Sequence, residues 1–108
     1  MKMLDNLEKI KVEQLYNKNQ FVIYYKDGEK SLIAFQSYCS LIAILKDKKL
    51  YINWDKWDYS KTTLKHLKIF INEYTPFIYI NKHQFLLFIK DSEKVELFKE
   101  WKQRTKKK

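Results

Sequence analysis

The chain has 108 residues and a mass of 13.4 kDa, which suits one compact domain, and 45% apolar residues can supply its core. A single glycine and a single proline exclude collagen-like and low-complexity chains, and a single cysteine excludes a disulfide-stapled scaffold. The formal charge is +9, from 22 basic and 13 acidic residues. Nucleic acid, nucleoprotein and acidic protein surfaces are therefore the first partners to consider.

The positive charge is concentrated at the C-terminus. Residues 99–108 carry six basic residues and one acidic residue, +5 of the total of +9, so residues 1–98 carry +4. We therefore expect one domain over residues 1–98 and a Lys-rich tail over residues 99–108 that adds long-range attraction. Arg104 is the only arginine, and lysine neutralises phosphate without reading base edges, so we expect salt-sensitive contacts of low sequence specificity. An AT-rich coding sequence accounts for the charge of the domain itself equally well.

The first part of the chain has the composition of an antiparallel sheet. Residues 4–16 combine helical and alternating patterns, which predicts a short helix passing into an edge strand near Ile10. Four runs of β-branched and aromatic residues follow and predict strands at residues 21–26, 31–35, 40–45 and 50–54. Gly28 supplies the positive φ of a tight hairpin turn between the first two of these strands. The pattern predicts a four-stranded meander with one face packed and one face wetter.

The second part of the chain contains the clearest helix. Ser60 is a good N-cap, apolar residues recur at steps of three and four from residue 61 to residue 74, and Pro76 ends the run. The opposite face of this helix carries Lys61, Lys65 and Lys68. Residues 81–90 fit either a buried helix capped by Asn81 or a buried strand, with the helix favoured, and residues 95–98 fit a last edge strand. The fold class is α+β: an antiparallel meander with one main amphipathic helix on one face and a small C-terminal unit.

Residues that carry chemistry are few. Cys39 adjoins an apolar run and is expected to be a small buried hydrophobe, and His66 is expected to be a surface histidine. Neither one forms a nucleophilic or zinc-binding spacing with His83. Asp47, together with Asp27 or Glu29, would supply the metal ligands of a small metal-dependent nuclease. We weigh this alternative below the interpretation of these residues as charged side chains of solvated turns. We therefore expect a protein that is not an enzyme and that has no cofactor and no metal.

Two tryptophans and a tyrosine lie at the end of the last predicted strand of the meander and in the connection to the helix. Trp54, Trp57 and Tyr59 either plug the end of the core or form exposed anchors for a partner. Tryptophan and tyrosine supply a large share of binding energy at interfaces and also stack on nucleobases. Both interpretations stay open, and the adjacent lysines strengthen the second.

This region carries a resemblance to a known group of proteins. The segments 35–38, 41–43 and above all 57–66, with its Trp-Asp-Tyr-Ser-Lys-Thr-Thr block, resemble a family of small uncharacterised proteins encoded by phages and plasmids of low-GC Gram-positive bacteria. The resemblance covers roughly residues 20–98. It implies a mobile-element origin but no known activity and no catalytic residues.

The expected function is inhibition by binding. Small phage accessory proteins often block host machinery, so we expect this one to inhibit a host nucleic-acid-targeting complex in the manner of an anti-CRISPR protein. The expected partner is a host nucleoprotein or an acidic protein surface, with DNA or RNA as a further candidate partner. No membrane partner is expected, and the expected location is the host cytoplasm. A general DNA- or RNA-binding protein of phage replication or packaging is the alternative. The expected binding residues are Lys61, Lys65, Lys68, Trp54, Trp57, Tyr59, Lys102, Arg104, Lys106, Lys107 and Lys108.

Overall fold

The computed structural model describes residues 8–16, 18–28 and 30–98. In chain order the elements are β1 (Glu8–Gln14), β2 (Gln20–Asp27), β3 (Lys30–Ser37), β4 (Ser40–Lys46), β5 (Lys49–Asn53), α1 (Lys61–Tyr74), α2 (Lys82–Asp91) and β6 (Val95–Phe98). The short helix predicted before Ile10 and the Lys-rich tail lie outside these residues.

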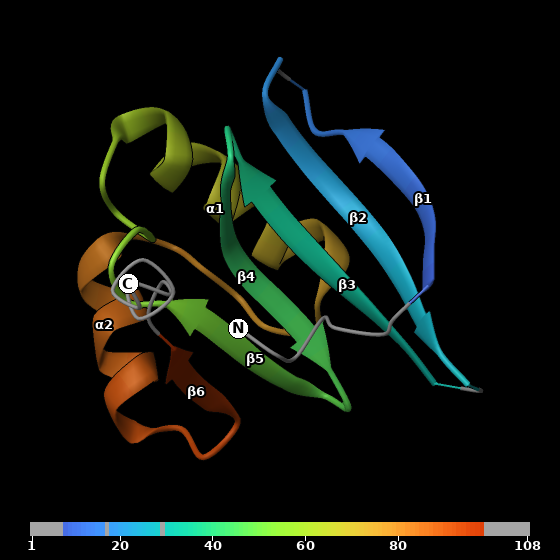
Figure 1. Cartoon of the computed structure of the whole chain (residues 1–108). Helices are drawn as coiled ribbons and strands as arrows, with labels where there is room; N and C mark the ends of the chain where they lie inside the picture. The colour runs from blue at the N-terminus through green and yellow to red at the C-terminus, as the bar shows by residue number, and fades with distance from the viewer. Residues whose placement is uncertain (1–7, 17, 29, 99–108) are drawn as a thin grey trace, which may run out of the picture.

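All six strands belong to one sheet, in the order β1-β2-β3-β4-β5-β6 (Figure 1). The first five strands form the antiparallel meander, and β6 pairs with β5 in parallel. The α+β class and the helix over residues 61–74 are confirmed. The sheet is larger than the predicted four strands because the two edge segments near Ile10 and at residues 95–98 both join it. The connection through α1 and α2 is long enough to return the chain for parallel pairing.

Tight turns join the strands of the meander. Gly28 has a φ of 66° in the turn between β2 and β3, as its position in the sequence predicts. The turn between β4 and β5 consists of Asp47 and Lys48, whose φ values of 53° and 65° match the backbone of a type I′ hairpin. The turn between β3 and β4 consists of Tyr38, with a φ of 57°, and Cys39. Cys39 is exposed there, so the expectation of a buried cysteine is wrong: the apolar run begins only after the turn.

The main core lies between the sheet and the helices. The ring of Phe35 on β3 stacks on Phe70 of α1, with the two ring centroids 5.7 Å apart, and Leu50 and Ile52 of β5 are buried in the same cluster. From α2, Phe85 and Ile89 join this cluster. The 3.6-residue pattern of α1 therefore buries its apolar stripe against one face of the sheet and leaves its lysines on the outside.

A second, smaller cluster lies on the other face of the sheet. Alternation along β3 turns Leu32 and Ala34 away from α1, and both are buried together with Ile44 of β4. Tyr25, Leu41, Tyr51 and Phe98 pack around them. This face is thus more apolar than the wetter face that the sequence predicts.

Residues 77–80 have the composition of a strand but do not form one. The side-chain amide of Asn72 donates to the carbonyl of Tyr79 at 3.0 Å and accepts from its N–H at 2.8 Å. The amide oxygen of Gln84 accepts from the N–H of Ile80 at 3.0 Å. These amides take the place of a neighbouring strand, so the segment runs outside the sheet.

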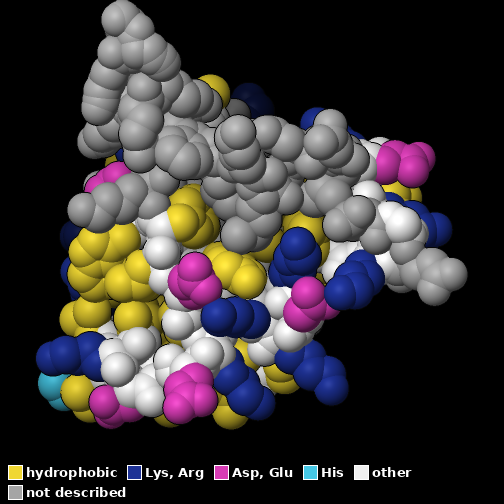
Figure 2. All heavy atoms as spheres, turned by 60° about the horizontal axis from the view of Figure 1, so that its bottom comes forward, with side chains coloured by type: hydrophobic (Ala, Val, Ile, Leu, Met, Phe, Trp, Pro, Cys, Tyr) yellow, Lys and Arg dark blue, Asp and Glu magenta, His cyan; other side chains and the backbone are white. Residues whose placement is uncertain are grey.

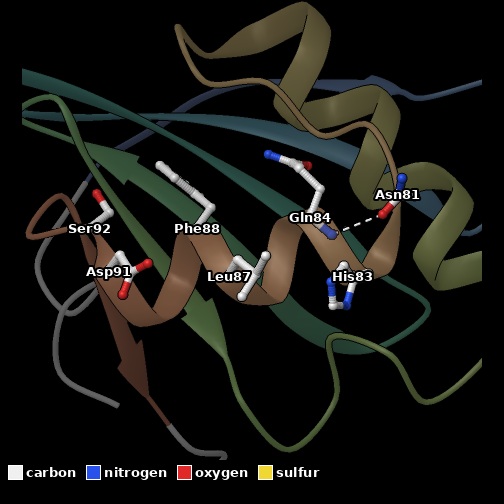
Figure 3. Close-up of a pocket in the computed structure, with 7 residues that line it drawn as sticks. All are labelled: Asn81, His83, Gln84, Leu87, Phe88, Asp91 and Ser92. Atoms are coloured by element: carbon white, nitrogen blue, oxygen red, sulfur yellow. Dashed lines mark hydrogen bonds between the residues drawn. The ribbon is translucent and has the colours of Figure 1, made fainter.

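The helical alternative for residues 81–90 is confirmed. Asn81 caps α2 by accepting from the N–H of Gln84 at 2.8 Å, the bond drawn in Figure 3. Phe85 and Ile89 occur at helical spacing on the buried side, while Leu87 is about half exposed. An open hollow of about 500 Å³ lies along the outer side of this helix, bordered by Asn81, His83, Gln84, Leu87, Phe88, Asp91 and Ser92.

Candidate anion-binding surface

Three lysines form a row on the outside of α1. Lys61, Lys65 and Lys68 are all exposed and follow one another at steps of four and three residues, which places them along one side of a helix. At a rise of about 1.5 Å per residue, the row extends over about 10 Å of the helix axis. We call these three residues the Lys row.

The Lys row has no acidic partner among the described residues. Four other lysines form ion pairs: Lys11 with Glu13, Lys30 with Asp47, Lys49 with Glu96, and Lys82 with Asp58. Basic and acidic side chains are also interspersed in the coloured part of the face shown in Figure 2, beside a group of hydrophobic side chains. The Lys row is thus a place where positive charge is left uncompensated.

The aromatic segment before α1 divides into one buried and two exposed residues. Trp57 is 2% exposed and packs against Phe85 with ring centroids 5.7 Å apart, so it belongs to the core and its assignment as an exposed anchor is wrong. Trp54 lies just beyond β5, stacks on Trp57 and is 39% exposed, and Tyr59 is 44% exposed. The structure therefore combines both interpretations: the inner indole plugs the core, and Trp54 and Tyr59 reach solvent.

A small pocket lies beside the Lys row. It has a volume of about 380 Å³ and is lined by Tyr16, Lys65, His66, Ile69 and Glu73. Tyr16 follows β1, and the other four residues lie along one side of α1. The hydroxyl of Tyr16 donates to the two carboxylate oxygens of Glu73 at 3.1 and 3.2 Å, which ties the β1–β2 turn to the helix. This hydrogen bond and the charge of Glu73 raise the pKa of Tyr16.

His66 lines this pocket and is buried, so the expectation of a surface histidine is wrong. The residue is 1% exposed because the β1–β2 turn and the sheet cover that side of α1. Its Nδ1 lies 2.8 Å from the carbonyl oxygen of Thr62. A carbonyl can only accept, so Nδ1 carries the proton and Nε2 is the ring nitrogen left for other contacts.

No sequence pattern predicts this pocket, because Tyr16 lies far along the chain from the other four residues that line it. The contact between Tyr16 and Glu73 spans 57 residues, and no local pattern announces it. Helical spacing does place the other four residues on one side of α1, at positions 65, 66, 69 and 73. The tyrosine that completes the pocket comes from a turn whose position only the folded sheet defines.

A buried amide lies under the first turns of α1. Gln20 pairs with Ser37 across β2 and β3, and the hydroxyl of Ser37 lies 2.9 Å from that of Thr63 on α1. The side chain of Gln20 is fully buried, and neither its nitrogen nor its oxygen has a hydrogen-bond partner in the described part of the chain. A buried polar group without a hydrogen-bond partner destabilises the folded state, so the side-chain amide of Gln20 lowers the free energy of unfolding.

A family model matches residues 6–85, most of the chain. The chain belongs to DUF8033, a family of unknown function. The matched region of this DUF8033 protein contains β1 to β5, α1, the Lys row and the pocket, and it ends within α2. Searches of curated proteins and of solved structures find no match to the chain.

The remaining site candidates of this DUF8033 protein are scattered. Asp27 ends β2, and the carboxylate of Asp47 lies 4.0 Å from the ammonium of Lys30. His83 is exposed on α2, on the rim of the outer hollow (Figure 3). Among the side chains that the structure describes, which do not include those of Asp27 and Glu29, no three from His, Cys, Asp or Glu are grouped to hold a metal ion. Lys102, Arg104, Lys106, Lys107 and Lys108 lie outside the described residues.

The helices of the described region are also short relative to a bilayer. Neither α1 nor α2 is long and apolar enough to cross a membrane.

Proposed function

We propose that this DUF8033 protein is a non-enzymatic accessory protein of a phage or another mobile element, and that it binds and inhibits a host nucleic-acid-targeting complex. The Lys row makes the contact with phosphate or with acidic side chains of the complex. Trp54 and Tyr59 serve as further anchors, and the basic tail adds long-range attraction.

The observation that carries this proposal is the uncompensated charge of the Lys row. Three ammonium groups on one side of one helix, with no described carboxylate within 4 Å, form a positive stripe that a polyanion neutralises. The stripe belongs to a rigid element, because Phe70 and Leu67 fix the opposite side of α1 in the core. A rigid stripe binds with little loss of backbone entropy.

The exposed aromatic residues support binding to a protein-containing partner. Trp54 is held by stacking on Trp57, with ring centroids 5.9 Å apart. The ammonium of Lys56 lies 5.1 Å from the ring centroid of Tyr59. Aromatic rings that are both exposed and held in place resemble the anchors of protein interfaces.

The mobile-element origin rests on the resemblance of the Trp-Asp-Tyr-Ser-Lys-Thr-Thr block. Residues 57–63 of this block form the turn before α1 and its first helical residues. They therefore include the N-cap Ser60 and the first member of the Lys row, Lys61.

A plating experiment tests the inhibitor proposal. Bacteria that carry an active RNA-guided nuclease directed against a phage are made to express the protein. We expect expression to raise phage plating by at least about tenfold and the variant K61Q/K65Q/K68Q to lose this protection, because neutral side chains no longer attract the partner. No increase in plating with the unmodified protein contradicts the proposal.

A matched control separates the Lys row from total charge. Lys9, Lys26 and Lys94 are exposed, and no described carboxylate forms an ion pair with any of them. The variant K9Q/K26Q/K94Q removes the same charge elsewhere and is expected to retain protection. Equal loss in both variants would show that the Lys row is not the contact.

A general nucleic-acid-binding protein is the second candidate, since a lysine stripe suits any polyanion. In that case the protein retards DNA or RNA in a gel in the absence of any host complex, and expression leaves phage plating unchanged. Affinity capture from the host with identification of both protein and nucleic acid distinguishes the two functions.

A further inference from the structure

The pocket beside the Lys row shares one residue with it. Lys65 is the central lysine of the row and also lines the pocket of Tyr16, His66, Ile69 and Glu73. A ligand that lies along the row therefore passes the pocket mouth. The volume of about 380 Å³ lies within the range of small-molecule sites, of roughly 300 to 1,000 Å³, and accommodates one planar ring system.

Tyr16 presents a fixed aromatic ring at this pocket. It is 68% exposed, yet its backbone has a φ of 65°, a conformation that side chains with a Cβ adopt at a cost. Its hydroxyl is tied to Glu73, so the ring does not rotate freely. An exposed and immobilised tyrosine ring is the kind of platform on which a nucleobase stacks.

His66 and Glu73 give the pocket polar groups of different kinds. With Nδ1 bonded to Thr62, Nε2 is the ring nitrogen of His66 that can accept from a ring N–H or an exocyclic amine. Glu73 places negative charge at the end of the pocket away from Lys65, eight residues further along α1. A phosphate is therefore attracted to the Lys65 end, and a base is directed towards Tyr16.

We propose that this pocket takes one nucleotide of a single-stranded nucleic acid, with its base stacked on Tyr16 against His66 and its phosphate on Lys65. The neighbouring phosphates lie along Lys61 and Lys68. This inference rests on the proposed function, because it uses the same Lys row and names the strand that the row binds. A base in a duplex is stacked and paired, so it reaches the pocket only after unstacking, and single strands are preferred.

Fluorescence anisotropy with a labelled oligo(dA) of about 12 nucleotides tests the preference, within the site sizes of single-strand binders. We expect tighter binding of this strand than of a duplex of the same length at low salt. We also expect Tyr16→Leu to weaken single-strand binding about tenfold, because the substitution removes the ring on which the base stacks.

Tyr38 provides the matched control. It is also an exposed tyrosine with positive φ in a turn of the sheet, at 45% exposure and 57°, but it does not line the pocket. Tyr38→Leu is expected to leave single-strand binding within about twofold. Equal effects of the two substitutions, or equal affinity for strand and duplex, overturn the inference.

NMR spectra of the two histidines give an independent readout. Adding AMP is expected to shift the imidazole resonances of His66 and to leave those of the exposed His83 in place. Equal shifts at both histidines, or shifts at neither, contradict the proposal that this pocket binds a nucleotide.

The two proposals fail differently. If Tyr16→Leu binds the strand as well as the unmodified protein, while the Lys row variant loses protection in the plating experiment, the pocket is wrong and the proposed function stands. If strand binding depends on Tyr16 but expression gives no protection, the inhibitor proposal is wrong and the pocket stands.

Discussion

Glu13 is the residue that ties β1 to both β2 and α1. Its carboxylate accepts hydrogen bonds from the hydroxyls of Tyr24, at 3.0 Å, and Tyr74, at 3.4 Å, and pairs with the ammonium of Lys11 at 3.0 Å. The hydrogen bonds of Lys11 and Tyr24 lower the pKa of Glu13. Burial, followed by the hydrogen bond to Glu13, raises the pKa of Tyr24 to about 12.

From the raised pKa of Tyr24 we expect the fold to lose stability at alkaline pH. Because the pKa of Tyr24 is about 12 in the folded chain against an ordinary value of 10.0, the protonated form stabilises the fold. The contribution is complete below pH 10 and is lost as the pH rises towards 12. We expect the free energy of unfolding of the unmodified protein to fall more steeply than that of Tyr24→Phe over this window. Urea unfolding at pH 8 and pH 11 measures it, and parallel slopes would contradict the assignment.

The buried side chain of Gln20 predicts a substitution that stabilises the fold. Its buried amide lacks a described hydrogen-bond partner, so Gln20→Met, which has a similar shape, removes two unsatisfied polar atoms. We expect the substitution to stabilise the fold by about 1 to 2 kcal/mol in urea unfolding. Gln14→Met on the exposed part of β1 serves as control, with no change expected. A destabilised Gln20→Met would mean that the amide has partners in solution.

Helix α1 is the element that positions the Lys row and four of the five residues that line the pocket. Its start is fixed by Ser60, whose hydroxyl accepts from the N–H of Thr63 at 3.0 Å, and the hydroxyl of Thr63 continues to Ser37 on β3 at 2.9 Å. These bonds hold the N-terminus of α1 against the end of β3. The helical pattern predicted the element and its cap, while the link to β3 depends on tertiary structure.

Loss of this cap should weaken the whole domain. Ser60→Ala leaves the N–H of Thr63 without its acceptor and is expected to cost about 1 kcal/mol of unfolding free energy. Ser31→Ala, on the exposed start of β3, is the control and should change stability by less than about 0.5 kcal/mol. The two variants are compared by urea unfolding, and equal losses would show that the cap does not govern the stability of α1.

The distribution of charge is a property of the whole molecule. In the described chain, ion pairs compensate Lys11, Lys30, Lys49 and Lys82. Of the described lysines without an ion pair, three lie together on one side of α1 as the Lys row. The total of +9 is thus less informative than the location of its unpaired part.

The salt dependence of binding should report this location. With about 0.7 counterions released per phosphate of a single strand, K61Q/K65Q/K68Q is expected to lower the slope of log affinity against log salt by about 2. The control K9Q/K26Q/K94Q should lower it by less than about 1. Anisotropy titrations over a series of NaCl concentrations measure both slopes, and equal decreases would contradict a localised contact.

The prediction of the fold succeeded where local pattern decides the structure. Four features act only on residues close to them in the sequence: the N-cap Ser60, the spacing of apolar residues in α1, the turn at Gly28 and the alternation along the strands of the meander. It failed where burial depends on groups far apart in the chain. His66 was expected on the surface, but the β1–β2 turn and the sheet cover it, and it is 1% exposed.

Some features of the candidate site could likewise be predicted from the sequence, and others depend on tertiary structure. The amino-acid sequence by itself determined the helix, its cap and the Lys row, because helical spacing and side-chain charge are local properties. Tertiary structure alone decided that Trp57 is buried, that His66 is covered and that Tyr16 closes a pocket over α1. The physical reason is that burial and the meeting of residues 57 positions apart depend on how the sheet packs against the helix, which no short segment encodes.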